Sequence, residues 1–197
     1  LLDHLRAGFA PGADGSYGDR FDEIRTAPVL VLDDLGTESP TAWAVEKLYQ
    51  LLNYRYNAQL PTVITTNKPL EDIEPRVASR LADTDLVNTL KILAPDFRAG
   101  DPHVTSDVST LTIHRHQTFE TFDSRGELTG EARQFFLRAI QAAREYAEDP
   151  HGWFVLTGEY GAGKTHLAAA IANQRSQRGK PVLFVAYQDL SNLFRTT

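Results

Sequence analysis

The sequence predicts an α/β fold with three layers, in which helices cover both faces of a parallel five-stranded sheet. Short apolar runs of strand length alternate along the chain with longer segments that repeat apolar residues at helical spacing. Val29–Leu32 is continuously apolar, as a parallel strand buried on both faces requires. Gly158–Thr165 is a glycine-rich segment between a strand and a helix, the arrangement typical of a phosphate-binding loop.

The first half of the chain is expected to supply three strands and the helices between them. Ser39-Pro40 offers an N-cap and a first-turn proline for a helix whose apolar face would be Ala44, Leu48, Leu51 and Leu52. The expected elements are helices at Leu1–Phe9, Phe21–Arg25, Thr41–Asn57 and Glu74–Leu81, and strands at Val29–Leu32, Thr62–Thr65 and Asp85–Leu93.

The second half is expected to supply two further strands. Residues 95–127 show no clear periodicity, and Asp101–Thr110 is the best linker candidate. The expected elements are helices at Thr129–Ala147, Thr165–Arg178 and Gln188–Thr197, and strands at Trp153–Leu156 and Pro181–Ala186. In the first of these helices we expect Phe135, Phe136, Ile140 and Ala143 on the buried side.

Composition excludes several kinds of site. The net charge of −6 provides no global positive field for nucleic acid, so a DNA contact would need a local patch. The chain has no cysteine, which excludes disulfides and thiolate metal sites and suits a cytoplasmic protein. No apolar run approaches the roughly 20 residues of a membrane span, so we expect no membrane contact.

The glycine-rich segment matches G-x-x-x-x-G-K-[ST], and it predicts binding of a nucleotide triphosphate. Its backbone N–H groups would face the phosphates, Lys164 would reach the β/γ-phosphates and Thr165 would hold Mg²⁺. The alternative is a glycine-rich turn with an incidental lysine. The expected contacts are Gly158, Glu159, Tyr160, Gly161, Ala162, Gly163, Lys164, Thr165 and His166.

Polar side chains end two of the strands. The apolar run before Asp33 and Asp34 has the pattern of a strand that brings carboxylates to a metal and to the attacking water, and we assign Asp33 to the metal and Asp34 to the water. An ordinary strand end running into an Asx turn is the alternative. Asn67 ends another strand and could bind the water or the γ-phosphate, although Asn-Lys-Pro is also an ordinary exit from a strand.

Arg76 and Arg80 lie one turn apart on the expected helix Glu74–Leu81. An arginine near an ATP site can complete the site of a neighbouring subunit as an arginine finger. From spacing alone, a pair of surface arginines is the simpler interpretation.

Together these segments resemble the P-loop AAA+ ATPases of the bacterial helicase-loader group (DnaC- and DnaI-like) and the similar IstB-like transposition helper ATPases. The matching stretches are Thr118–Asp123 (TFETFD), Trp153–Ala170 (WFVLTGEYGAGKTHLAAA), Val182–Val185 (VLFV), Val29–Gly36 (VLVLDDLG), Leu48–Asn57 (LYQLLNYRYN), Pro61–Asn67 (PTVITTN) and Arg76–Leu81 (RVASRL). They span most of the chain.

The resemblance implies Walker A at Gly158–Thr165, Walker B at Asp33 and Asp34, sensor 1 at Asn67 and an arginine finger at Arg80. It implies the strand order 85–93, 153–157, 61–66, 29–34, 181–186. It also implies ATP hydrolysis with Mg²⁺, helicase loading as the main expectation and transposition helping as the alternative. A replicative helicase or a transposase, single-stranded DNA and further copies of the chain would be its partners.

The order of the motifs departs from that group, in which Walker A precedes Walker B. Here residues 1–100 carry Walker B, sensor 1 and the finger, residues 101–127 form a linker and entry segment, and residues 128–197 carry Walker A. Leu1–Arg6 and Leu190–Arg195 resemble two versions of one helix, and methionine is absent. The order predicts a circular permutation with a duplicated joint, or pieces of related chains joined or numbered out of order.

Some features of that group are not recognisable in the sequence, and some other residue patterns are too weak to indicate a site. A lid with a second sensor arginine and a separate helicase-gripping domain are not recognisable, so a non-hydrolysing nucleotide-dependent adaptor or fragment stays open. His114 and His116 lack further clustered ligands for a metal. Tyr49, Tyr54 and Tyr56 are expected to pack in the core and an interface rather than stack on bases.

Overall fold

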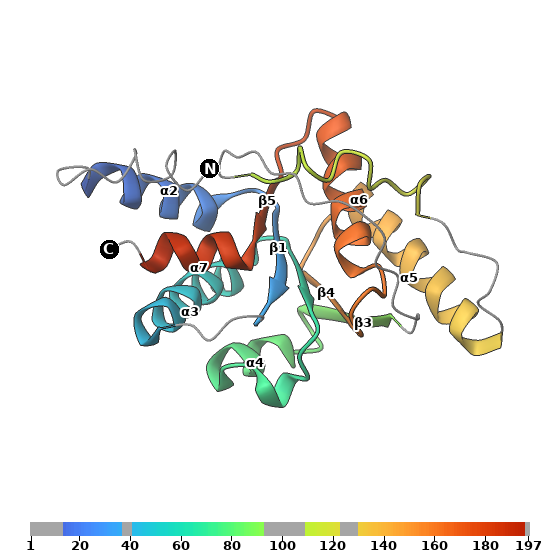
Figure 1. Cartoon of the computed structure of the whole chain (residues 1–197), viewed down its shortest axis with the longest axis horizontal. Helices are drawn as coiled ribbons and strands as arrows, with labels where there is room; N and C mark the ends of the chain where they lie inside the picture. The colour runs from blue at the N-terminus through green and yellow to red at the C-terminus, as the bar shows by residue number, and fades with distance from the viewer. Residues whose placement is uncertain (1–13, 37–40, 93–108, 123–129, 196–197) are drawn as a thin grey trace.

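In the computed structural model, the described residues are 14–36, 41–92, 109–122 and 130–195 (Figure 1). The helix expected at Leu1–Phe9 and most of the Asp101–Thr110 linker lie outside them. The predicted cap at Ser39 is wrong, because the helix Ala42–Asn57 has Thr41 as its N-cap, whose hydroxyl accepts the backbone N–H of Ala44 at 3.2 Å. Among the described residues, none of the helices combines the length and the apolar character that crossing a membrane requires.

The five strands form one parallel sheet with the order β3-β4-β2-β1-β5, which confirms the strand order predicted from the sequence. Each expected strand is present, with bounds that differ by at most three residues. The strands are β1 (Leu30–Leu35), β2 (Thr62–Thr66), β3 (Val87–Ile92), β4 (Trp153–Gly158) and β5 (Leu183–Ala186).

Helices cover both faces of the sheet, so the three-layer prediction is confirmed (Figure 1). On one face lie α2 (Asp14–Thr26), α3 (Ala42–Asn57), the short 3₁₀ helix η1 (Leu70–Asp72), α4 (Pro75–Leu81) and α7 (Tyr187–Arg195). On the other lie α5 (Gly130–Glu148) and α6 (Lys164–Gln177). The two halves of the chain therefore share one sheet and one pair of cores.

Successive apolar side chains of β1, β2, β4 and β5 enter opposite cores, as the two-residue period of a strand requires. In β1, Leu30 and Leu32 belong to the core that includes α3, whereas Val31 belongs to the core that includes α6. The predicted apolar face of α3 is confirmed, since Ala44, Leu48, Leu51 and Leu52 are all buried.

A buried arginine connects α3 to the end of α2 and to the start of β2. Arg55 is fully buried, and its guanidinium donates to the carbonyl oxygens of Ile24, Arg25, Ala27 and Pro61 and to the hydroxyl of Thr62. Burial lowers the pKa of Arg55 to about 10. These bonds satisfy donors that would otherwise be costly to bury.

One local prediction is wrong. Phe135 is 41% exposed, because the buried stripe of α5 runs through Phe136, Ala139 and Ala143, and Phe135 lies one residue away from that stripe. His114 lies in a turn, and its ring packs on Phe184 with centroids 4.9 Å apart. Within the described ranges, no three His, Cys, Asp or Glu side chains form a metal-binding group.

Candidate nucleotide-binding site

The predicted site lies at the carboxyl ends of β4, β1 and β2. These strands are parallel, and β2 is paired on one side to β4 and on the other to β1. The phosphate loop follows β4, the two acids end β1 and Asn67 follows β2. Parallel strands end at the same edge, so the topology brings the three motifs together.

Glycine is required at two points of the phosphate loop. Gly158 has φ +149°, and a Cβ there would lie 2.4 Å from the carbonyl oxygen of Ile92 on β3. Gly163 has φ +91°, and a Cβ there would lie 2.9 Å from the ring of Phe122. Both backbone conformations disfavour a side chain. The loop can therefore curl tightly between β3 and the segment that carries Phe122.

Lys164 lies inside this curl. It is 6% exposed, and its ammonium donates to the carbonyl oxygens of Gly158 (3.0 Å) and Glu159 (2.7 Å). Burial lowers the pKa of Lys164, while the negative charges of Asp34, Asp33 and Glu159 oppose that shift. The lysine of one half of the chain and the acids of the other half therefore share one electrostatic environment.

Asp33 is the more buried of the two acids, at 7% exposure. Burial raises its pKa, and hydrogen bonds from Thr65 and Thr165 partly offset this effect. Carboxylate and hydroxyl oxygens are the donors that Mg²⁺ prefers. Thr165 is thus among the groups that favour the charged form of Asp33, and as a donor set the two residues fit the metal that the sequence assigned to them.

Asp34 has a left-handed backbone, with φ +63°. Its carboxylate accepts a hydrogen bond from the side-chain amide of Asn67 at 2.9 Å. The second acid and the end of β2 are therefore in direct contact, as expected if both orient one water molecule.

A segment that the motifs did not mark as part of the site packs beside the loop. We call Ser109–Phe122 the strap, which crosses α6 (Figure 1). Asn173 of α6 donates to the carbonyl oxygens of His114 and Gln117, each at 2.9 Å. The Nε2 of His166 lies 3.0 Å from the carbonyl oxygen of Thr118, and because a carbonyl only accepts, this nitrogen carries the proton.

The His166 side chain is therefore turned toward the strap. Burial lowers the pKa of His166, which favours the neutral ring. The nucleotide contact predicted for His166 stays a prediction. It would be made by the backbone N–H of this residue, in the first turn of α6. The one sequence signal for the strap was the stretch Thr118–Asp123 (TFETFD), which resembles the helicase-loader group.

Arg80 lies on α4, and its guanidinium contacts α3 and α4. It donates to the hydroxyl of Tyr49 (3.1 Å), to the side-chain oxygen of Asn53 and to the carbonyl oxygen of Arg76 (2.6 Å). Arg76 forms ion pairs with Glu46 and with Glu74, at 3.0 and 2.6 Å. Both arginines are thus on the face of the sheet opposite to α6, rather than beside Lys164.

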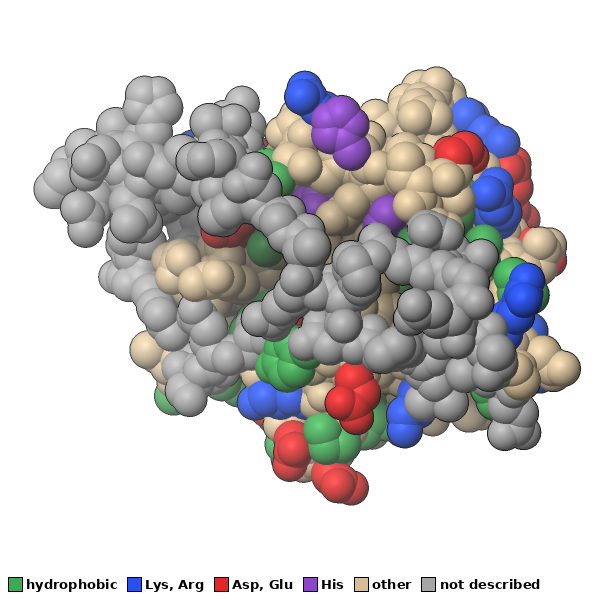
Figure 2. Space-filling view, turned by 45° about the vertical axis from the view of Figure 1, so that its right-hand side comes forward, with side chains coloured by type: hydrophobic (Ala, Val, Ile, Leu, Met, Phe, Trp, Pro, Cys, Tyr) green, Lys and Arg blue, Asp and Glu red, His purple; other side chains and the backbone are tan. Residues whose placement is uncertain are grey.

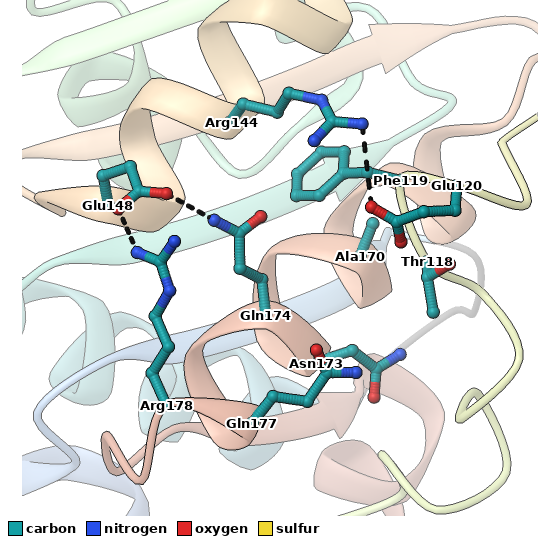
Figure 3. Close-up of a pocket in the computed structure, with 10 residues that line it drawn as sticks. All are labelled: Thr118, Phe119, Glu120, Arg144, Glu148, Ala170, Asn173, Gln174, Gln177 and Arg178. Carbon is teal, nitrogen blue, oxygen red and sulfur yellow. Dashed lines mark hydrogen bonds and ion pairs between the residues drawn. The ribbon is translucent and has the colours of Figure 1, made fainter.

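The strap, α5 and α6 also enclose a polar pocket of about 310 Å³ that the sequence did not predict (Figure 3). Glu148 accepts hydrogen bonds from Gln174 (2.6 Å) and from Arg178, and Arg144 lies 3.9 Å from Glu120. Its α6 lining begins at Ala170, beyond the turn of helix that carries Lys164 and Thr165. The pocket is therefore separate from the phosphate loop.

Comparisons with known proteins find similarity to an ATP-binding family and to helicase loaders. Residues 102–197 match the family described as IstB-like ATP binding protein. The chain is 35% identical over 88 residues to the replicative helicase loader DnaC of Escherichia coli (strain K12), covering 43% of this chain and 33% of the relative. It is 36% identical over 55 residues to the replicative helicase loader DnaI of Bacillus subtilis (strain 168), covering 27% of this chain and 18% of the relative.

The chain thus spans a third or less of the length of these two relatives. No solved structure matches it. The five-stranded parallel sheet and the IstB-like match together give a P-loop NTPase fold with an ATP-binding segment, and the chain is homologous to DnaC and DnaI helicase loaders.

Proposed function

We propose that the chain binds ATP with Mg²⁺ and hydrolyses it slowly, in one site built from both halves of the sequence. The observation that carries this proposal is that β4, β2 and β1 are parallel neighbours, so the phosphate loop after β4 and the acids of β1 lie at one edge of the sheet. The charge coupling of Lys164 to Asp33 and Asp34 supports it. In this proposal residues 1–100 and 128–197 form one AAA+ core, and 101–127 link them.

Each side chain has a defined task in that site. Lys164 neutralises the β/γ-phosphates, and the loop from Gly158 to Thr165 donates backbone N–H groups to them. Asp33 and Thr165 would hold Mg²⁺, which supplies charge stabilisation to the transferring phosphoryl group. Asp34 accepts a proton from the attacking water, and Asn67 orients that water and Asp34 together.

Arg80 acts in trans in this proposal. It belongs to α4 on the sheet face opposite to α6, so it is available to a neighbouring copy rather than to its own phosphate loop. An arginine finger supplied by a neighbour stabilises transition-state charge and makes hydrolysis depend on assembly. The active form would then be a homo-oligomer.

The biological role that we propose is helicase loading in DNA replication, in the cytoplasm, with a replicative helicase and single-stranded DNA as partners. The matches to DnaC and DnaI support it. Figure 2 shows acidic and basic side chains interspersed at the edge of the face in view, which agrees with the net charge of −6. DNA would therefore bind through a local patch or in the assembly.

A transposition helper ATPase is the second candidate, with a transposase as partner. The match of residues 102–197 to the IstB-like ATP binding family favours it. Both roles use the same site residues, so a pull-down with a replicative helicase and with a transposase separates them. A nucleotide-dependent adaptor that does not hydrolyse ATP is the third, and it predicts binding without turnover.

The test is ATP turnover by the purified chain, with and without single-stranded DNA, beside Lys164→Ala and Asp34→Asn. We expect Lys164→Ala to lose ATP binding and Asp34→Asn to keep binding but lose turnover. Stimulation by DNA supports either DNA-directed role. Wild-type turnover no higher than that of Lys164→Ala, with ATP still bound, would overturn hydrolysis and favour the adaptor.

A further inference from the structure

Strand β1 carries one extra residue opposite β2, at the position of the two acids. Leu32 pairs with Ile64 and Leu35 with Thr66, so three steps along β1 match two steps along β2. Asp34 has φ +63° within this irregularity. A bulge of this kind interrupts both the side-chain alternation and the hydrogen-bond ladder. Consecutive acids can then serve the same site, but the bulged backbone needs a partner from elsewhere.

The hydroxyl of Thr65 supplies that partner. Thr65 lies on β2 opposite the bulge and is 1% exposed. Its Oγ1 donates to Oδ1 of Asp33 at 2.6 Å and accepts the backbone N–H of Asp34 at 2.8 Å. One hydroxyl has one proton and two lone pairs, so this pair of bonds uses its donor and one acceptor position. Thr65 is therefore bonded to both acids at once.

Thr66 supports the far end of the same bulge. Its hydroxyl donates to the carbonyl oxygen of Leu35 at 2.8 Å, where regular pairing resumes. The contact to the acids themselves, however, comes from Thr65.

We propose that Thr65 is a positioning residue that fixes the carboxylate of Asp33 and the backbone of Asp34 for ATP hydrolysis. The proposal rests on the function proposed above. Valine at this position has nearly the shape of threonine but neither donates to Asp33 nor accepts from Asp34. The part-buried N–H of Asp34 and the buried carboxylate of Asp33 would each lose a partner, and the bulge could then relax. A displacement of about 1 Å at a reacting group can cost on the order of 100-fold in rate.

The competing interpretation is that Thr65 only stabilises its strand. Thr62 is the matched control, because it is also a fully buried threonine of β2 with a bonded hydroxyl. Its bonds go to the carbonyl oxygen of Leu60 (2.9 Å) and to Nε of Arg55 (3.0 Å), at the opposite end of the strand. If Thr65 acts only through stability, Thr65→Val and Thr62→Val will change turnover alike.

The experiment compares Thr65→Val, Thr65→Ser and Thr62→Val for kcat, KM for ATP and the Mg²⁺ concentration at half-maximal rate. We expect Thr65→Val to lower kcat about tenfold or more, to raise the Mg²⁺ requirement and to leave KM for ATP nearly unchanged. Thr65→Ser, which keeps the hydroxyl, should restore most of kcat. Thr62→Val should leave kcat near wild type at temperatures where it is folded.

Wild-type kcat in Thr65→Val, or equal loss in Thr65→Ser and Thr65→Val, would overturn the proposal. If Thr65→Val does not fold, as judged by thermal unfolding, Thr65→Ala is measured in its place and judged by the same outcomes.

A second readout does not depend on turnover. The amide of Asp34 should exchange with deuterium slowly in wild type and Thr65→Ser, and faster in Thr65→Val, as resolved by NMR. Mg²⁺ should also strengthen binding of a non-hydrolysable ATP analogue more in wild type than in Thr65→Val. If wild type shows no turnover, hydrolysis fails as a function, while these two measurements still decide the role of Thr65. Equal exchange and an equal Mg²⁺ effect in the two proteins would overturn it.

Discussion

The side-chain amide of Asn67 donates a hydrogen bond to the carboxylate of Asp34 across 2.9 Å, joining the ends of β2 and β1. The two residues are far apart in the sequence, and they are in contact because two parallel strands end at the same edge of the sheet. The bond fixes the orientation of the Asp34 carboxylate. It also makes the two residues mutually dependent.

Substitutions at Asn67 should therefore impair chemistry more than binding. We expect Asn67→Ala to lower kcat about tenfold or more, because Asp34, the proposed general base, loses its orientation. Asn67→Asp should be worse, because it places a second carboxylate beside Asp34. Steady-state kinetics measure both, with Asn88→Ala on the exposed side of β3 as the control. A raised KM with unchanged kcat would contradict the assignment.

Mixing two inactive variants tests whether Arg80 acts between copies. Arg80→Ala keeps an intact phosphate loop, and Lys164→Ala keeps an intact finger. Random assembly of an equal mixture leaves about a quarter of the interfaces with both parts, so about a quarter of wild-type turnover should return. As a control for mixing itself, Arg80→Ala is combined with Arg115→Ala, which changes an exposed position of the strap and leaves Lys164 and Arg80 in place. Failure to recover turnover in assemblies of normal size would mean that Arg80 does not act in trans.

Arg55 should be among the most sensitive positions for stability. Arg55→Met leaves four carbonyl oxygens and the Thr62 hydroxyl without their donor, so we expect a loss of about 3 kcal/mol or more in the free energy of unfolding. Urea unfolding measures it. Arg115→Met, an exposed arginine exchanged in the same way, should stay within about 0.5 kcal/mol of wild type.

The pair of Tyr56 and Asp83 predicts a stability difference limited to a window of pH. The Tyr56 hydroxyl donates to Asp83, which lowers the pKa of Asp83 below 3.8 and raises the pKa of Tyr56 above 10.0. A lowered acid pKa adds stability above 3.8 that disappears as pH falls through the folded-state pKa. A raised tyrosine pKa adds stability that disappears as pH rises through its folded-state pKa.

Tyr56→Phe keeps the ring edge against Trp153, with centroids 5.9 Å apart, and removes only the hydroxyl. Wild type should therefore be more stable than Tyr56→Phe between these limits, and the difference should vanish in acid and in strong base. Thermal unfolding across pH measures this, and NMR titration should show the pKa of Asp83 rising in the variant. A difference that persists in strong acid would contradict the linkage.

Much of the fold could be predicted because it depends on local patterns. The apolar run at Val29–Leu32 predicted strand β1, and the apolar face at helical spacing predicted helix α3. The phosphate-loop motif predicted the strand before it and the helix after it. The strand order came from resemblance, because pairing in a parallel sheet is set by contacts far apart in sequence. Phe135 was misplaced because an amphipathic helix with two adjacent phenylalanines leaves the buried one undecided.

The site was predictable as a set of motifs but not as a network. Asp33, Asp34 and Asn67 stood out because polar groups end apolar strands. Thr65 did not, since one threonine among three in β2 has no distinguishing pattern until the bulge in β1 is known. The contacts of Asn173 and His166 with the strap were equally hidden, because they join side chains to carbonyl groups of an irregular segment.

The pairing of Leu30 with Leu183 has a consequence for how the sheet folds. Strands β1 and β2 are neighbours in the sequence, but the strands that flank them in the sheet, β5 and β4, belong to the other half of the chain. Contacts of such long sequence separation slow folding. The β1–β2 pair therefore has two open edges until β4 and β5 dock on it. A nucleotide that contacts both the loop after β4 and the acids of β1 would bind the docked form alone and so stabilise it.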